Sequence, residues 1–388
     1  MNSEQCDVSF FLQKLDNLTI IHLRNSRDLI EIPDLSRAPN LKILCLAYCV
    51  SLRQLHPSIF TALKLRELHL IGCKKIESLK TNIHSKPIRY MSFSGCTEIN
   101  TLNVWFILDS APSLVKLYLN KCCNLETLPD NIQNCLMLEI LDLNDCENLK
   151  SLAKLPASLR DLRAMNCTYL DTNSIQGEIL ENMLHRLPIK NYEDGLYLRY
   201  LLPGAEVPRE FDFYTREASV VLPPIQKSGS FRFVCCVILS EGLNLTTDEV
   251  GCTIYDHGVK VVQLDCISRG IASGTLISDH VFLVCCSWLE NDYFARVDNN
   301  DHYTLSFEFK VKHYVDGGEQ VSTKGIKGCG VIPLYDLEHG SGVDGSTSSK
   351  VEIVELPFNA QVSSDEFHVD ENEDAQQQLL PPKKRKRT

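Results

Sequence analysis

Residues 41–52 read LKILCLAYCVSL and residues 138–149 read LEILDLNDCENL, so both follow the pattern LxxLxLxxCxxL. Related segments recur along the first half of the chain, and seven copies align by an opening aliphatic residue. The opening residues are Leu18, Leu41, Leu65, Ile88, Leu114, Leu138 and Leu159. Successive openings lie 23, 24, 23, 26, 24 and 21 residues apart. A period of this length is typical of proteins that stack one structural unit.

The period predicts a leucine-rich-repeat solenoid over residues 18–170, because the steps fall within that repeat's range of about 20 to 29 residues. In each copy the LxL core alternates, which sends its leucines to one face of a short strand. One copy cannot bury its leucines alone, so stacking forms the core, at about 1.5 to 3 kcal/mol per buried Leu or Ile. We expect a curved α/β solenoid, a horseshoe, with parallel strands on its concave side.

The side chains between the leucines are expected to project from the concave face and to bind a protein. Tyrosine, histidine and charges of both signs suit a protein partner better than phosphate or lipid, since Tyr and Arg are favoured interface anchors. The alternative is a solvated sheet face without a partner. The predicted binding residues are His22, Arg24, Tyr48, Glu67, His69, Tyr90, Lys116, Tyr118, Asn120, Asp142, Asn144, Asp161 and Arg163, with Cys45 and Ser92 beside them.

Six copies carry a cysteine three residues after the LxL core, namely Cys49, Cys73, Cys96, Cys122, Cys146 and Cys167. A small, weak donor there can turn inward and hydrogen-bond backbone groups that the turn leaves unpaired. The 17 cysteines are odd in number and the N-terminus lacks a secretory signal, which indicates reduced thiols. No CxxC occurs, so we predict structural cysteines and no metal site.

Composition excludes several other classes of protein. A length of 388 residues suggests two to three domains. Acidic residues outnumber basic ones by 50 to 39, for a net charge of -11, so the chain as a whole is repelled by nucleic-acid backbones. The longest apolar runs are strand-length, well short of the about 20 residues that cross a bilayer. We therefore expect a soluble protein that binds neither nucleic acid nor membrane directly.

The repeat pattern stops near residue 170. In residues 171–199, four apolar residues recur every fourth position, as on one face of a helix; they are Ile175, Ile179, Met183 and Leu187. We predict a helical cap or linker that closes the open end of the solenoid. Residues 1–17 are expected to cap the other end.

Residues 200–338 change to strand-length runs separated by turns, which predicts an all-β sandwich of jelly-roll or Ig-like type. The eight predicted strands are 197–202, 219–222, 231–239, 252–255, 259–264, 281–288, 303–312 and 328–335. In the run 303–312, Leu305, Phe307 and Phe309 alternate with polar residues, as one buried and one wet face require. The run FRFVCCVIL at 231–239 is apolar on both faces, so we place it centrally.

Two stretches resemble a known family. Residues 29–59, LIEIPDLSRAPNLKILCLAYCVSLRQLHPSI, resemble the repeats of plant TIR-type nucleotide-binding leucine-rich-repeat (TIR-NBS-LRR) immune receptors, in IPDLS, NL, the cysteine, SL and LHPSI. LPGAEVP at 202–208, followed by ASVVLPP, is similar to the opening of the jelly-roll domain that follows those repeats. The motif residues are Leu202, Pro203, Gly204, Glu206 and Pro208. SDHVFLV and IKGCGVIPLY extend the resemblance to residue 335.

The resemblance implies that the two domains recognise a pathogen effector or a guarded host protein in defence. In that family, recognition activates a TIR domain through a nucleotide switch. This chain has no GxxxxGK[ST] loop and no TIR domain, so we expect no enzyme activity and no cofactor. TIR and nucleotide-binding domains would act from upstream or in trans. The alternative function is a substrate-binding adaptor of a ubiquitin ligase, which needs an F-box-like segment ahead of the repeats.

Residues 339–388 turn polar and acidic and end in PPKKRKRT, so we expect this tail to be mostly disordered. Its five consecutive basic residues are Lys383, Lys384, Arg385, Lys386 and Arg387. A nuclear import receptor can bind such an extended cationic peptide, and the alternative is a solubilising tail. The predicted location is therefore both cytoplasmic and nuclear.

Overall fold

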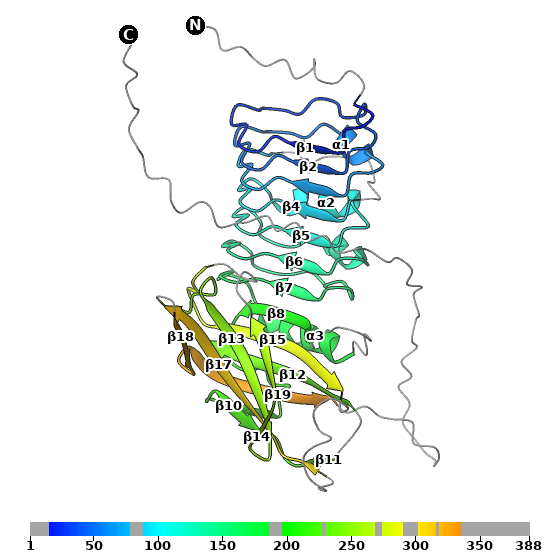
Figure 1. The fold of residues 1–388 in the computed structure, drawn as a ribbon. Helices are drawn as coiled ribbons and strands as arrows, with labels where there is room; N and C mark the ends of the chain where they lie inside the picture. The colour runs from blue at the N-terminus through cyan, green and yellow to red at the C-terminus, as the bar shows by residue number, and fades with distance from the viewer. Residues whose placement is uncertain are drawn as a thin grey trace, which may run out of the picture. The chain divides into compact units, whose positions relative to one another are not determined.

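The computed structural model describes residues 15–77, 88–185, 196–226, 230–267, 274–289, 302–315 and 318–334. Its main feature is one twelve-stranded sheet in the order β1-β2-β3-β4-β5-β6-β7-β8-β15-β12-β19-β9. The first seven strands come from the repeats, and the last five from the second half of the chain (Figure 1). One sheet therefore runs through both regions that the sequence separates into domains.

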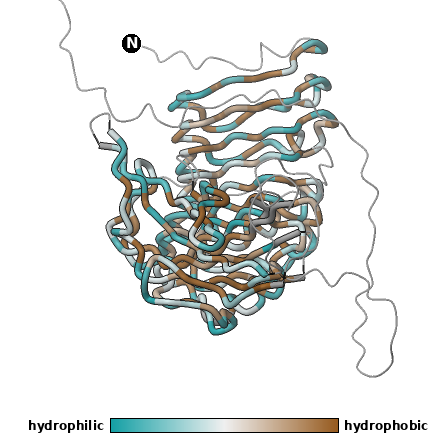
Figure 2. Tube along the Cα trace, turned by 60° about the horizontal axis from the view of Figure 1, so that its bottom comes forward, coloured by the Kyte–Doolittle hydropathy of each residue, from teal (hydrophilic) through white to brown (hydrophobic). Residues whose placement is uncertain are grey.

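The repeat strands are short, parallel and in register. They are β1 (Ile20–His22), β2 (Ile43–Cys45), β3 (Glu67–His69), β4 (Tyr90–Ser92), β5 (Lys116–Tyr118), β6 (Ile140–Asp142) and β7 (Asp161–Arg163). Six of the seven opening residues are at most 1% exposed, and only Leu18 of the first repeat is half-buried. Apolar segments recur in each turn of the repeat region (Figure 2). The predicted leucine-rich-repeat sheet is confirmed.

Short helices occupy the far side of the repeats from the strands. They are α1 (Ser58–Thr61), α2 (Thr101–Ser110) and the 3-10 helix η2 (Asp130–Asn134). The longest helix, α2, lies in the repeat with the longest step, where the extra residues complete further helical turns. The Asn100 side chain accepts the Asn103 N–H and the Asn103 side chain accepts the Asn100 N–H, both at 3.1 Å, so each satisfies a free donor at the start of the helix.

A left-handed residue ends the strand segment in every repeat. These residues are Asn25, Tyr48, Gly72, Gly95, Lys121, Asp145 and Asn166, with φ between +57° and +70°. Tyr48, which was predicted among the residues of the concave face, is one of these left-handed residues. The strand β2 ends at Cys45, and Tyr48 lies in the turn. A Cβ on Gly72 would come 2.7 Å from Tyr48 Cδ1, so the tyrosine ring needs glycine in the next repeat.

The six repeat cysteines are buried in the leucine core. Each Sγ lies 3.0 to 3.3 Å from a carbonyl oxygen of the preceding repeat: Cys49 on Leu23, Cys73 on Leu46, Cys96 on Leu70, Cys122 on Phe93, Cys146 on Leu119 and Cys167 on Leu143. These contacts form a row of weak hydrogen bonds along the solenoid, which we call the thiol row. Each bond joins two neighbouring repeats.

Strand β8 (Leu196–Pro203) joins the repeats to the second half. It pairs in parallel with β7 and antiparallel with β15 (His280–Leu289), and the boundary predicted at residue 200 falls within it. The Tyr200 hydroxyl donates to the Leu159 carbonyl at 2.9 Å. Helix α3 (Asn173–His185) buries Ile175, Ile179 and Met183 in the leucine core. The expected helix is present, but a strand rather than the helix continues the sheet at the end of the repeats; Leu187 lies outside the described residues.

The second half is a sandwich of two layers. The long sheet ends with β12 (Ser230–Leu239), β19 (Ile326–Leu334) and β9 (Phe213–Thr215). The second sheet contains β10 (Ser219–Val221), β17 (Leu305–Val315), β13 (Asp248–Asp256), β14 (Val259–Ile267) and β18 (Gly318–Ser322), while β11 (Ile225–Gln226) pairs with β16 (His302–Tyr303). Strand β12 is central, as predicted, between β15 and β19. The eight predicted runs all contain strands, and β9, β11 and β18 were missed.

The two faces of the long sheet belong to different cores. Alternate residues of β12 and β15, such as Val234 and Leu283, join the leucine core of the repeats. Their neighbours, such as Phe233 and Phe282, pack in the sandwich core against the second sheet. The predicted repeat solenoid followed by a β-sandwich is confirmed, and the leucine core extends across the strand junction.

The buried thiols should resist modification in the folded protein. Burial raises the pKa of the Cys73 and Cys167 thiols to about 12, and the protonated thiol is a poor nucleophile. Iodoacetamide at pH 8 should therefore alkylate the half-buried Cys45 and Cys123 well before Cys73 and Cys167, as peptide mass spectrometry would show. In guanidinium the four rates should converge. Equal rates in the native protein would contradict the described core.

Candidate protein-binding surface

The predicted binding residues lie on or beside the outward face of β1–β7, here called the strand face. Their exposure varies along the sheet: His22, Arg24 and Lys116 are exposed, His69 and Ser92 are buried, and Asp161 of β7 is 3% exposed. Near β7 the second sheet covers this face. The strand-face residue of β8, Leu201, is already part of the sandwich core, and Ile267 of β14 lines the same small cavity as Asp161 and Arg163. The strand face thus divides into an open zone on β1–β5 and a covered zone from β6 onward.

The open zone contains three aromatic rings on consecutive strands, here called the aromatic ladder: His69, Tyr90 and Tyr118. Ring centroids lie 4.6 Å apart for His69 and Tyr90, and 5.3 Å apart for Tyr90 and Tyr118. Both pairs are tilted, a favourable arrangement for aromatic rings. Beyond the strands, the Arg24 guanidinium carbon lies 5.3 Å from the centroid of the Tyr48 ring, within the distance of a cation–π contact.

Charged groups flank the aromatic ladder. Glu67 Oε2 lies 3.1 Å from Nε2 of His69. This hydrogen bond, together with the charges of His69 and Lys116, lowers the pKa of Glu67 despite its burial. Lys116 is exposed on β5. Asn120, just beyond β5, accepts a hydrogen bond from the Ser94 hydroxyl, and Ser94 lies 3.1 Å from Ser92. The open zone thus combines rings, a cation and an ordered polar row.

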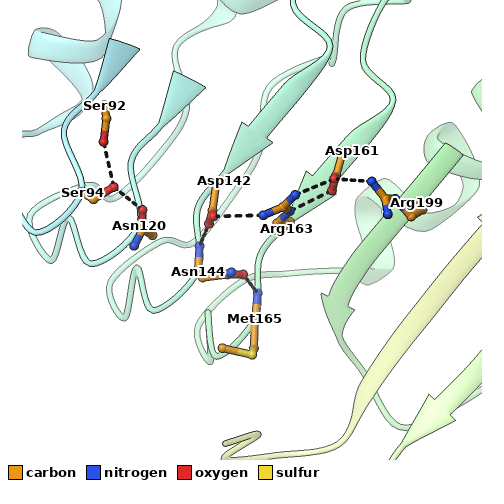
Figure 3. A network of polar contacts seen from close by, with 9 residues as sticks. All are labelled: Ser92, Ser94, Asn120, Asp142, Asn144, Asp161, Arg163, Met165 and Arg199. Atoms are coloured by element: carbon orange, nitrogen blue, oxygen red, sulfur yellow. Dashed lines mark hydrogen bonds and ion pairs between the residues drawn. The ribbon is translucent and has the colours of Figure 1, made fainter. Parts of the chain in front are cut away.

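The covered zone holds an ion network (Figure 3). Arg163 donates to both Asp161 oxygens, from Nε at 3.1 Å and from Nη2 at 2.8 Å. Arg199 of β8 donates to Asp161 Oδ2 at 3.1 Å, and Asp142 lies 3.8 Å from Arg163. Burial alone would lower the pKa of the Arg163 guanidinium, but the bonds to Asp161 and the charges of Asp161 and Asp142 hold it above its ordinary value.

These residues are bound to one another and to the backbone. Asp142 accepts the N–H of Asn144, and the side-chain oxygen of Asn144 accepts the N–H of Met165 at 2.8 Å. Four predicted binding residues, Asp142, Asn144, Asp161 and Arg163, therefore sit under the second sheet. In this structure they order the junction between the repeats and the sandwich and do not form an open surface. These residues are of the same types and occupy the same alternating positions as those of the open zone, so the sequence could not distinguish the two zones.

A second set of contacts at the junction was not foreseen from the sequence. The N–H of Asn166, in the left-handed turn of the last repeat, donates to Nε2 of His280 at 2.9 Å, and His280 Nδ1 lies 2.8 Å from the Ser278 carbonyl. The ring is therefore neutral, with its proton on Nδ1. The Asn166 side chain also contacts Thr275 and Ile277 backbone. Arg199, Asn166 and His280 carried no local signal, because their partners are distant in sequence.

The post-repeat motif forms the end of β8 and the turn after it. Leu202 is buried and Pro203 ends the strand, while Glu206 is exposed and Pro208 buried. Gly204 has φ +155°, and a Cβ there would lie 2.7 Å from Val281 Cγ2. The glycine therefore allows the chain to turn against β15. The predicted import signal, Lys383 to Arg387, lies outside the described residues.

No group of three or more His, Cys, Asp or Glu side chains lies within the described residues in a position to hold a metal ion. No described helix is both long and apolar enough to span a bilayer.

The chain is similar in sequence to several plant disease resistance proteins. No protein-family model matches the chain. It is 28% identical over 363 residues to the Arabidopsis thaliana disease resistance protein RPS6, covering 84% of this chain and 30% of RPS6. It is 33% identical over 150 residues to disease resistance protein RML1A and 28% identical over 276 residues to RML1B, both of Arabidopsis thaliana. These matches cover 14% of RML1A and 27% of RML1B, so the chain spans less than a third of each relative.

Loss of the shared carboxylate should weaken the junction. Asp161→Asn removes the negative charge between two arginines, so we expect the free energy of unfolding in urea to fall by about 2 to 3 kcal/mol. Glu126→Gln breaks the Lys150–Glu126 pair, in which both side chains are 61% exposed, and should change it by less than about 0.5 kcal/mol. Equal effects of the two variants would show that the covered zone is solvated.

The neutral ring of His280 should make stability depend on pH. Burial lowers the pKa of His280 below its ordinary 6.5, against the opposing effects of the Ser278 carbonyl and the Asp279 and Asp145 charges. Below pH 6.5 the unfolded chain takes up this proton and the folded chain does not, so stability is full above pH 6.5 and falls with pH. His280→Gln keeps an acceptor without titrating. Urea midpoints from pH 7.5 to 5.5 should fall more steeply for the native protein than for this variant; parallel slopes would refute the assignment.

Proposed function

Because the chain is homologous to plant disease resistance proteins through its repeats and β-sandwich, we propose that it is a non-catalytic recognition module in plant defence. Its partner is a pathogen effector or a guarded host protein, which it binds through the open zone of the strand face and the adjoining sandwich. The homology supports the defence role. The aromatic ladder of His69, Tyr90 and Tyr118 on β3–β5 is the observation that supports the surface.

The physical basis of the surface is its preorganisation. The strands hold three rings at fixed spacing, so few rotamers are lost when a partner binds. Tyrosine combines a large apolar area with a polar end, and clustered aromatic residues carry much of the energy at protein interfaces. The covered zone cannot take part without separating the two sheets. Binding therefore falls to the predicted residues His22, Arg24, Glu67, His69, Tyr90, Lys116, Tyr118 and Asn120, with Tyr48 at their border.

In this proposal, the TIR and nucleotide-binding activities that the family resemblance implies belong to other domains. They would act from upstream in a longer chain or in trans, and this segment would supply recognition alone without a cofactor. The basic end of the tail would direct part of the protein to the nucleus through an import receptor, leaving the rest in the cytoplasm. The ubiquitin-ligase adaptor would use the same strand face.

A two-hybrid screen of plant and pathogen proteins against the full chain tests the surface. Partners that use the open zone should be lost with Tyr90→Ala plus Tyr118→Ala, which remove two anchors and should weaken binding by about 2 kcal/mol or more. The control is Leu63→Ser plus Leu136→Ser, at two exposed apolar positions off the strand face. Partners insensitive to the tyrosine pair but lost in the control would contradict the proposal. Recovery of ligase subunits alone would favour the adaptor.

A further inference from the structure

A row of basic residues borders the open zone. Lys42, Arg66 and Arg89 occupy the same position in three consecutive repeats, one residue before β2, β3 and β4. They are direct neighbours, because the Arg66 N–H donates to the Lys42 carbonyl at 2.8 Å and the Arg89 N–H to the Arg66 carbonyl at 2.9 Å. All three are exposed; the matching position before β5 is Val115, and the exposed Lys116 lies one residue further along, at the start of β5. We call these four residues the basic ridge.

The basic ridge has little compensating negative charge. Within the described part of the chain, Lys42, Arg66 and Arg89 form no ion pair with a carboxylate. Glu67 is the acidic residue among the outward positions of β2–β5, and it is bound to His69 while also interacting with Lys116. Like charges on adjacent strands repel. This local positive charge, in a chain whose net charge is -11, therefore favours an anionic ligand.

The aromatic ladder, on β3–β5, lies beside the basic ridge, whose Lys42, Arg66 and Arg89 directly precede β2–β4. Tyr90 directly follows Arg89, and Lys116 pairs with Tyr90 across β4 and β5. His69 and Tyr118 lie two residues further along their strands, on the same face. A ligand on this surface thus meets cations along one edge and apolar rings along the other. Fixed apolar rings favour a protein ligand over a bare polyanion.

The spacing of the basic ridge selects the shape of that protein segment. Neighbouring strands lie about 4.8 Å apart, so the four cations span about 14 Å across three steps. An α-helix advances 5.4 Å per turn, and carboxylates at i, i+4, i+7 and i+11 span roughly 16 Å. Alternate residues of an extended chain lie about 6.8 Å apart and would span about 20 Å. The helical spacing therefore differs from the span of the basic ridge by about 2 Å and the extended spacing by about 6 Å, so the helix is the closer match.

We propose that the basic ridge and the aromatic ladder together bind an acidic amphipathic α-helix of a partner protein, with the helix axis running across the strands. Its carboxylates face Lys42, Arg66, Arg89 and Lys116, and the adjoining apolar stripe packs on Tyr90 and Tyr118. A helix about 10 Å wide covers both features at once. This inference rests on the proposed recognition function and specifies the chemistry of the partner.

The test uses the full chain and a fluorescein-labelled model peptide. The peptide is an alanine-rich helix with glutamates at i, i+4, i+7 and i+11 and leucines at i+1, i+5, i+8 and i+12. A second peptide has the same composition and helicity but distributes the glutamates around the helix. Fluorescence anisotropy should show the first binding about tenfold more tightly, with an advantage that shrinks as salt rises.

A charge-reversal pair locates the site. Lys42→Glu with Arg66→Glu and Arg89→Glu should weaken binding of the first peptide by about tenfold or more. The matched control reverses Arg37, Lys74 and Lys154, which are exposed off the strand face, and should change affinity by less than about twofold. Circular dichroism confirms that both variants fold. Similar affinity for the two peptides, or equal losses in the two variants, overturns the proposal, as does tighter binding of a single-stranded RNA of equal charge.

The two functional proposals can fail separately. If the screen yields partners that need Tyr90 and Tyr118 but not the basic ridge, the recognition function stands and the acidic-helix ligand is wrong. If the model peptide binds through the basic ridge while no partner depends on the strand face, the helix preference stands and the proposed function is wrong.

Discussion

The parallel pairing of β7 with β8 is the interaction on which the rest of the structure depends. It makes the last repeat strand a neighbour of a sandwich strand, so the backbone hydrogen bonds of the repeats continue into β15, β12 and β19. The leucine core continues behind this sheet, and the second sheet covers the strand face in front of it. The sandwich therefore helps to define where the recognition surface stops.

A single face of one sheet serves as both surface and core. On β1–β5 outward side chains such as His22, Tyr90 and Lys116 meet solvent, while on β8, β15 and β12 the same face packs against the second sheet. The ion network of Asp142, Arg163, Asp161 and Arg199 lies at the transition, where the Asp161 side chain is 5% exposed and that of Arg199 is still 30% exposed. Buried charged side chains are stable there only when they are paired with opposite charges. The network thus marks the boundary between the two uses of the face.

Sequence patterns within single repeats and strands predicted the elements that depend on local packing. The leucine period located the repeat strands, since a shift of one residue would expose the inward leucines, and alternation located Leu305, Phe307 and Phe309. Strands β9 (FYT), β11 (IQ) and β18 (GEQVS) belong to no repeat and contain no run of apolar residues that would mark them as strands. Tyr48 lies in a left-handed turn three residues beyond the end of β2, which the alternation of the strand does not indicate. Burial of Asp161 and Arg163 and the bond from Asn166 to His280 depend on a sheet that folds back from over a hundred residues away, which no local window contains.

The half-buried first repeat has a consequence for how the solenoid loses structure. Leu18, Ile21 and Leu23 are half-buried, whereas their counterparts in the following repeats are almost fully buried. In a stack held by nearest-neighbour contacts, loss of order begins at the end with the weakest neighbour. At the other end, β8 and the sandwich anchor the last repeat. Fraying in this chain should accordingly run from β1 toward β7, reaching the aromatic ladder long before the thiol of Cys167, so that amide exchange would be graded along the sheet.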